Sequence, residues 1–92
     1  MSGDAETSEL AEIEKWLVAA CQSLGLGITG AEEDFFTAGA TSLTAIRLIA
    51  KAEERYGEDA LPPDDLYADS QVRQIAASIR RNAGRIDALD EA

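Results

Sequence analysis

Apolar residues recur at steps of three and four along the first third of the chain, the spacing that places side chains on one face of an α-helix. They are Leu10, Ile13, Leu17, Cys21 and Leu24. The pattern predicts a helix that starts near Ser8, with Thr7 or Ser8 as its N-cap. Gly25 and Gly27 predict its end, because glycine readily adopts the left-handed conformation found at helix C-termini.

A second helical pattern follows a long glycine-rich connection over residues 25–41. It predicts a helix from about Ser42 to Tyr56, with Gly57 as the stop signal. The positions expected to face the core are Leu43, Ile46, Ile49 or Ala50, and Glu53. The positions expected to face water are Thr44, Arg47, Lys51 and Glu54.

The last third of the chain predicts one short helix and one long helix. Pro62 and Pro63 disfavour a helix across this point, although either fits a first turn, so "PDDLYA" is expected to form a short helical turn. Asp69 is the predicted N-cap of the final helix. Its apolar face comprises Val72, Ile75, Ala76 and Ile79. Asn82 and Gly84 are expected to close it.

No alternating apolar pattern long enough for a strand is visible, so the predicted fold class is all-α. Three main helices and one short helix bury their apolar stripes against one another as a small bundle. The domain is expected to span residues 8–82, after a flexible N-terminus over residues 1–7 and before an acidic tail over residues 83–92.

The connection over residues 25–41 is longer than most loops in compact domains, and loops of this length are often functional. Its apolar residues Leu26, Ile28, Phe35 and Phe36 offer a way to attach it to the core. At least one phenylalanine is expected to be a core anchor, which is favoured over a role in stacking on a ligand.

The charge balance narrows the class of partners. Eighteen acidic and eight basic residues give a net charge of −10, which repels nucleic-acid phosphates and anionic lipids. We therefore expect neither nucleic acid nor membrane as a partner, and favour a protein that bears a basic patch. No signal sequence or apolar run of membrane-spanning length is visible, so the predicted location is cytoplasmic.

The chain contains no histidine and a single cysteine. Nucleophile systems that need a histidine base, and histidine-rich metal sites, are therefore excluded. Cys21 has no partner for an internal disulfide, and its helical spacing from Leu17 and Leu24 predicts a core residue. With no phosphate-binding loop or metal motif either, we predict no catalytic residues, no metal and no enzyme activity.

Ser42 is the one residue whose chemistry stays open. A serine directly before an apolar-periodic segment is an ordinary helix N-cap, a role worth about 1 kcal/mol. The small neighbours Gly39, Ala40 and Thr41 also leave its hydroxyl accessible to a partner. A helix N-terminus favours a phosphate, so covalent modification at Ser42 is the alternative to a cap.

The segment "DFFTAGATSLTAIRL", Asp34 to Leu48, resembles the phosphopantetheine-attachment motif of acyl and peptidyl carrier proteins. The resemblance covers roughly Leu10 to Arg80, because "LPPDDLYADSQVRQIAASI" is similar to the family's short third helix and its fourth helix. It implies a right-handed bundle of three long helices and one short helix.

The resemblance implies that Ser42 receives 4′-phosphopantetheine from coenzyme A, through a separate phosphopantetheinyl transferase. The arm's thiol would then hold an acyl, aminoacyl or peptidyl group as a thioester. Implied partners are adenylating or acyl-loading enzymes and condensation, ketosynthase, tailoring or thioesterase enzymes, with the carrier itself a monomer. The residues expected at the partner-recognition surface are Thr41, Leu43, Ile46 and Arg47. Leu43 and Ile46 are alternatively core residues, and Arg47 is alternatively a solvated charge.

Two positions depart from the family pattern. Ala40 stands where a second glycine is usual, and it would be strained only at a positive φ. Thr41 replaces the usual Asp or His, which leaves the cargo class open, with a peptidyl carrier slightly favoured over a polyketide carrier. The leading hypothesis is a free-standing carrier of a natural-product pathway, and the alternative is an unmodified acidic helical adaptor.

Overall fold

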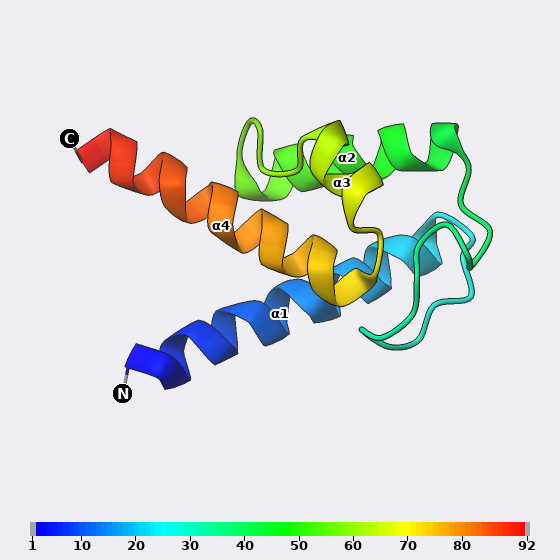
Figure 1. Ribbon diagram of the computed structural model, residues 1–92, viewed down its shortest axis with the longest axis horizontal. Coiled ribbons are helices and arrows are strands. Elements are labelled where there is room, and N and C mark those ends of the chain that lie inside the picture. The colour runs from blue at the N-terminus through cyan, green and yellow to red at the C-terminus, as the bar shows by residue number, and fades with distance from the viewer. Residues whose placement is uncertain (1, 92) are drawn as a thin grey trace.

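The computed structural model describes the backbone of residues 2–91 and the side chains of residues 9–83. Four helices follow one another along this part of the chain: α1 (Ser2–Ser23), α2 (Ser42–Tyr56), α3 (Pro63–Ala68) and α4 (Val72–Glu91) (Figure 1). No strand occurs between residues 2 and 91, where the one β-bridge joins Asp34 to Gln71. The predicted all-α fold of three long helices and one short helix is confirmed.

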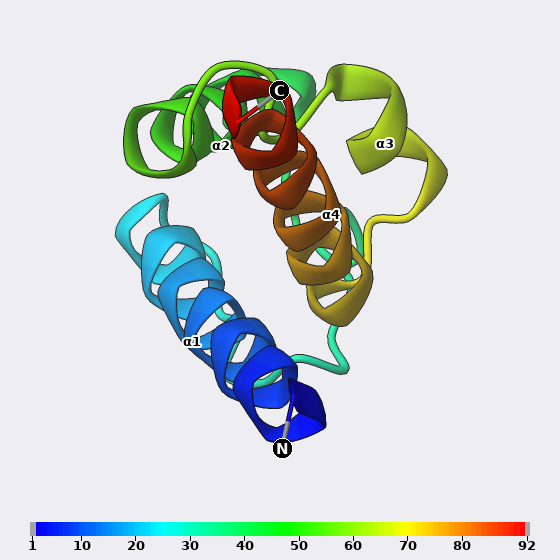
Figure 2. The same ribbon diagram turned by 90° about the vertical axis from the view of Figure 1, so that its left-hand side faces the viewer.

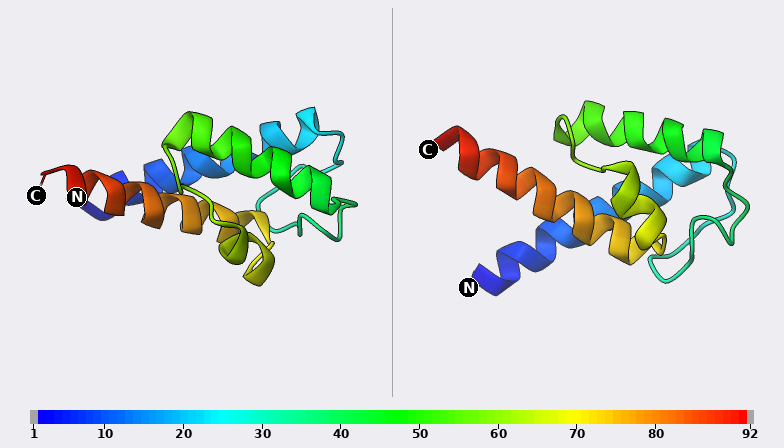
Figure 3. Two further views of the ribbon diagram at one scale, coloured as in Figure 1. Left: turned by 90° about the horizontal axis from the view of Figure 1, so that it is seen from above. Right: turned by 45° about the horizontal axis from the view of Figure 1, so that its top comes forward.

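Helices α1 and α4 pack against each other, and α2 lies beside both (Figure 2). The short helix α3 contacts α2 and α4. The start of α1 and the end of α4 lie at one end of the molecule, and the connection between α1 and α2 lies at the other (Figure 3). The first residue of α2 is therefore at the end where the long loop packs.

The core consists of the apolar stripes that the helices turn toward one another. From α1 it contains Ile13, Leu17, Ala20 and Cys21, and from α4 it contains Val72, Ile75, Ala76 and Ile79. Removing a leucine- or isoleucine-sized side chain from water stabilises the fold by about 1.5–3 kcal/mol. The predicted apolar face of the final helix is confirmed, and in the first helix Leu10 and Leu24 are only partly buried.

The predicted core face of α2 is wrong. Its buried residues are Ala45, Leu48 and Ala52. Leu43 and Ile46 are 58% and 61% exposed. Ala50 and Glu53 are exposed as well, and Ile49 is partly buried. Ala45, Leu48 and Ala52 are three and four positions apart and share the inward face of the helix. Leu43 and Ile46 lie on its outward side.

The bounds of α1 differ from the prediction at one end only. The helix begins at Ser2 instead of near Ser8, so neither Thr7 nor Ser8 is its N-cap. At the other end Gly25 has a φ of 92°, and the N–H of Leu26 donates to the carbonyl of Cys21 at 3.0 Å. This left-handed glycine with a six-residue hydrogen-bonded closure is the predicted glycine stop.

The predicted ends of α4 are both wrong. Asp69 follows α3, where its N–H donates to the carbonyl of Asp65. The free N–H groups of α4 are instead taken by loop carbonyls, with Val72 N–H donating to Glu33 and Arg73 N–H donating to Ala31. A tertiary contact has replaced the expected side-chain cap.

At its C-terminal end α4 continues to Glu91, so neither Asn82 nor Gly84 closes the helix. Asn82 is buried, and its side-chain N–H₂ group donates to the Ala60 carbonyl at 3.1 Å and to Asp65 Oδ2 at 3.2 Å. An asparagine that the sequence places at a helix end is therefore a packing residue in mid-helix.

Candidate functional site

The loop that leads to α2 is anchored in the core. Leu26, Ile28 and Phe35 are buried, which confirms the prediction that at least one phenylalanine is a core anchor. Phe36 is partly buried and stacks on Tyr67 of α3, with ring centroids 5.5 Å apart and an interplanar angle of 10°. The two adjacent phenylalanines thus attach the loop to the core and to α3.

Asp34 holds the same loop to the start of α4. Its Oδ1 accepts a hydrogen bond from Ser70 Oγ at 2.6 Å, and its Oδ2 accepts one from the Thr37 N–H at 2.9 Å. These bonds, that from Ser70 foremost, lower the pKa of Asp34 because they favour the charged carboxylate. The N–H of Phe35 also donates to the Ser70 carbonyl at 2.8 Å.

The chain turns into α2 through Gly39 and Ala40. Gly39 has a φ of 111°, a conformation that favours glycine. The φ of Ala40 is not positive, and its N–H donates to the Phe35 carbonyl at 3.3 Å. The alanine that departs from the family pattern is therefore unstrained, since its backbone does not require a glycine.

The N-cap of α2 is Thr41, and the interpretation of Ser42 as the cap is wrong. Thr41 Oγ1 accepts from the Thr44 N–H at 3.3 Å, while the Thr41 N–H donates to Thr44 Oγ1 at 3.1 Å. These two bonds form a reciprocal capping box, with threonine in the place where glutamate or glutamine is common. Thr41 thus satisfies helix-end groups that Ser42 was expected to satisfy.

Ser42 is consequently the first residue of α2, and it is exposed. Within the described part of the chain its hydroxyl has no hydrogen-bond partner, and the N–H groups of Ser42 and Leu43 have no acceptor. The first turn contains no acidic residue. Free N–H groups and the positive end of the helix dipole make this a favourable place for an anion.

The four residues predicted for partner recognition lie together at this end of α2. Thr41, Leu43 and Arg47 are exposed, as is Ile46. Leu43, Ile46 and Arg47 share one outward side of the helix because they are three and four positions apart. The alternative that Leu43 and Ile46 are core residues is excluded.

Sequence reasoning missed Tyr67, which is 53% exposed and stacks on Phe36. The signal in the sequence that could have identified it is an aromatic residue within the short segment "PDDLYA". Tyr67 therefore places an exposed aromatic side chain of α3 against the loop that precedes Ser42.

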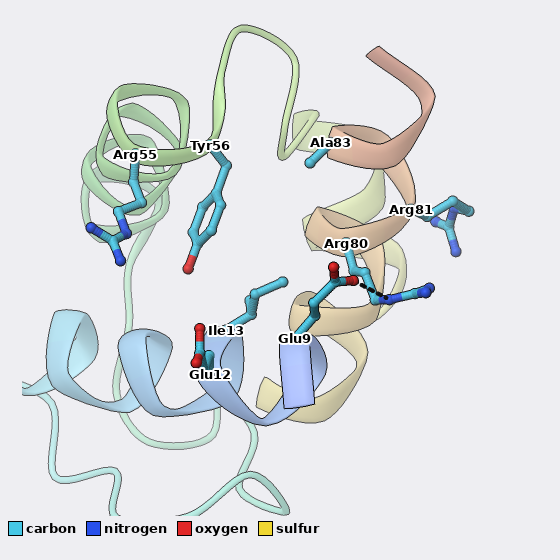
Figure 4. Close-up of a pocket in the computed structure, with 8 residues that line it drawn as sticks. All are labelled: Glu9, Glu12, Ile13, Arg55, Tyr56, Arg80, Arg81 and Ala83. Atoms are coloured by element: carbon cyan, nitrogen blue, oxygen red, sulfur yellow. Dashed lines mark ion pairs between the residues drawn. The ribbon is translucent and has the colours of Figure 1, made fainter. Parts of the chain in front are cut away.

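A separate depression of about 410 Å³ lies between α1, α4 and the last turn of α2 (Figure 4). Tyr56 points into it from the end of α2, and Arg80 Nε lies 3.5 Å from Glu9 Oε1 on its wall. Ser42 is at the other end of α2, roughly 20 Å away at about 1.5 Å per residue. The depression therefore does not belong to the Ser42 site.

Cys21 is fully buried, and burial raises the pKa of its thiol to about 11. Such a thiol stays protonated near neutral pH and is a poor nucleophile, which agrees with the predicted core role. Among the residues that the structure describes, no three metal-ligating side chains gather. None of the described helical segments combines the length and apolar character needed to cross a bilayer.

A family model for the phosphopantetheine attachment site matches residues 15–79, more than half of the chain. The chain belongs to this family. Domains of the phosphopantetheine-attachment family are carriers to which 4′-phosphopantetheine is attached, and they act with a phosphopantetheinyl transferase and acyl-handling enzymes. No curated protein and no solved structure matches the chain.

The surroundings of Ser42 fit this group. An exposed, unbonded hydroxyl is free to form an ester with phosphate, and the free N–H groups of the first turn favour the negative charge that results. The first turn of α2 contains no acidic residue, so no carboxylate there repels the phosphate. When attached, the group supplies a thiol that holds acyl groups as thioesters.

Proposed function

We propose that Ser42 is the attachment residue and that this carrier presents acyl, aminoacyl or peptidyl groups to partner enzymes. The observation that carries the proposal is the exposed hydroxyl of Ser42 at the first position of α2, left without a hydrogen bond because Thr41 caps the helix. The anchored loop supports it, since the turn before Ser42 is held by Phe35 and Asp34.

The attachment step needs a partner's base. Ser42 Oγ forms a bond to the β-phosphorus of coenzyme A, the bond from that phosphorus to the 3′,5′-ADP moiety breaks, and 3′,5′-ADP leaves. The hydroxyl proton passes to a base of the transferase, because no described side chain of this protein is hydrogen-bonded to the Ser42 hydroxyl to accept it. The chain itself contributes an accessible oxygen and the N–H groups at the start of α2.

The surface beside Ser42 is proposed to receive the partner enzymes. Exposed Leu43 and Ile46 supply apolar contact, and Arg47 lies next to them on the same side of α2. Thr41 contributes by fixing the start of the helix. Apolar residues at the centre of an interface commonly supply most of its binding free energy.

The pathway is proposed on the family resemblance. The paired phenylalanines and the segments "SLTAIRL" and "IAASIR" favour a peptidyl carrier over a polyketide carrier. We propose that the protein is a monomeric carrier of natural-product biosynthesis in the cytoplasm. Loading assays with candidate amino acids and acyl groups would identify the cargo class.

The proposal is tested by incubating the protein with coenzyme A and a broad-specificity phosphopantetheinyl transferase, followed by intact mass measurement. We expect wild type to gain one phosphopantetheinyl group and Ser42→Ala to gain none. Thr37→Ala, which removes another exposed hydroxyl nearby, should be modified as wild type. No gain on wild type contradicts the assignment and favours the unmodified adaptor. An equal gain on Ser42→Ala also contradicts it, because the group would then be attached to another residue.

A further inference from the structure

Three basic residues form a row along α2. Arg47, Lys51 and Arg55 are four positions apart, so each lies one turn beyond the last on neighbouring parts of the helix surface. All three are exposed, and none has a carboxylate within ion-pair distance among the described residues. Arg55 lies over the ring of Tyr56, 5.8 Å from its centroid. We call these three residues the basic row.

The other arginines whose side chains are described are neutralised locally. Arg73 lies 3.7 Å from a Glu32 oxygen, and Arg81 lies 3.7 Å from an Asp65 oxygen. Arg80 lies 3.5 Å from a Glu9 oxygen. The basic row is therefore set apart from these cations by having no carboxylate partner of its own.

The sequence around the row lacks acidic residues. From Phe35 to Ala52 there is no aspartate or glutamate, although the chain as a whole has 18 acidic residues and a net charge of −10. The exposed face of the first turns of α2 thus combines positive charge with Leu43 and Ile46. Glu53 and Glu54 follow only in the last turns of the helix.

The row ends beside a groove between α1 and α2. This depression of about 430 Å³ is lined on the α1 side by Trp16, Ala19, Ala20 and Ser23. Lys51, Glu54 and Arg55 line it on the α2 side. Apolar residues therefore lie at both ends of the basic row, exposed on the helix near Ser42 and recessed in the groove near Tyr56.

We propose that the basic row, with Leu43, Ile46 and the groove, docks a protein partner that presents carboxylates beside apolar side chains. Close to the surface, opposite charges on the two proteins steer the encounter, whereas the acidic remainder of the molecule repels the same partner in other orientations. A partner that presents carboxylates is the opposite of the partner with a basic patch that the net charge of −10 predicts. The proposal names the partner chemistry of the proposed carrier and rests on that function for its biological meaning.

The test uses two synthetic amphipathic helical peptides as probes. One carries glutamates beside leucines, and the other has lysine at each glutamate position. Each is titrated at low ionic strength into ¹⁵N-labelled, unmodified protein, and amide signals are followed by NMR. We expect the glutamate peptide to shift signals of residues 42–56 and the lysine peptide to leave them unshifted.

Matched variants test whether the row is responsible. Arg47→Gln/Lys51→Gln should bind the glutamate peptide roughly tenfold more weakly, because two exposed charge contacts are lost. Lys15→Gln/Arg73→Gln removes the same charge elsewhere and should bind as wild type. Equal binding by the first variant, equal shifts with the lysine peptide, or shifts confined to another surface would overturn the proposal.

Two further readouts complete the test. If the α2 signals of free protein move with its own concentration, and sedimentation shows a dimer that Arg47→Gln/Lys51→Gln abolishes, the occupant is a second copy and the proposal is wrong. The peptide titration needs no attached group, so its outcome is independent of the mass assay at Ser42. Failure of the proposed function and failure of the docking surface are thus separately detected.

Discussion

At the scale of single residues, capping α2 and presenting a free hydroxyl are the roles of two different residues, Thr41 and Ser42. Thr41 bonds back to Thr44 and closes the helix end, and Ser42 is left exposed. A serine engaged as the cap would direct its oxygen at a backbone N–H and present less of it to a partner. Thr41 therefore has a structural role as the cap of α2, independent of the cargo class that this position indicates.

Removing the cap should destabilise the fold without removing the attachment residue. We expect Thr41→Ala to lower the free energy of unfolding by about 1 kcal/mol, because the Thr44 N–H loses its side-chain acceptor. Thr41→Ser should retain most of the stability, since it keeps the accepting oxygen. Urea denaturation would measure both, and unchanged stability of Thr41→Ala would show that the capping box contributes little.

At the scale of elements, the loop before α2 and the first turn of α4 stabilise each other. Loop carbonyls accept the N–H groups of Val72 and Arg73, and the Gln71 side chain donates to the Glu32 carbonyl at 2.9 Å. Asp34 joins the two segments through Ser70. A loop that is long and rich in glycine is in this way held firmly enough to position the start of α2.

The Asp34 contact predicts a pH dependence of stability. Its pKa is lowered in the folded state, so its stabilisation is present above the unfolded value near 3.9 and is lost as pH falls through the folded value. Asp34→Asn should therefore be less stable than wild type at pH 7, with a smaller difference at pH 3. Chemical denaturation at the two pH values measures this.

Ser70→Ala provides the control for that experiment because it keeps the carboxylate and removes its main hydrogen-bond donor. Its stability should depend on pH less steeply than that of wild type over the same range. A difference between wild type and Asp34→Asn that stays constant from pH 7 to pH 3 would contradict the role of the ionised carboxylate.

At the scale of the whole molecule, a buried polar cluster joins α3 and the segment before it to α4. Asp65 Oδ2 accepts from Ser78 Oγ at 2.7 Å and from Asn82 Nδ2 at 3.2 Å. Asn82 also reaches the Ala60 carbonyl, next to the buried Leu61. Hydrogen bonds as well as apolar contacts thus fix how the short helix sits in the bundle.

Truncating Asn82 should lower the free energy of unfolding more than truncating an exposed residue of the same helix. We expect Asn82→Ala to lower the free energy of unfolding by about 1–3 kcal/mol, because the buried Ala60 carbonyl loses its donor. Gln74→Ala, at an exposed position of the same helix, should change stability by less than about 0.5 kcal/mol. Thermal or urea unfolding of the two variants compares them, and similar values would argue against the cluster.

Local chemistry determined much of this protein from sequence alone. The bounds of α2 and α3, the glycine stops at Gly25 and Gly57 and the apolar face of α4 follow from backbone preferences and spacing within one element. The segment around Ser42 also indicated the family. These features depend on neighbours in the chain, which a sequence displays directly.

Tertiary structure decided the rest. Which face of α2 is buried depended on where the other helices pack: they cover the face that carries Leu48, and Leu43 and Ile46 are exposed. Loop carbonyls accept the first N–H groups of α4 and fix where it begins. The Asn82 side chain donates to the Ala60 carbonyl, 22 positions away in the chain. Such contacts join residues far apart in the chain, and hydrophobic spacing and capping rules describe only one element at a time.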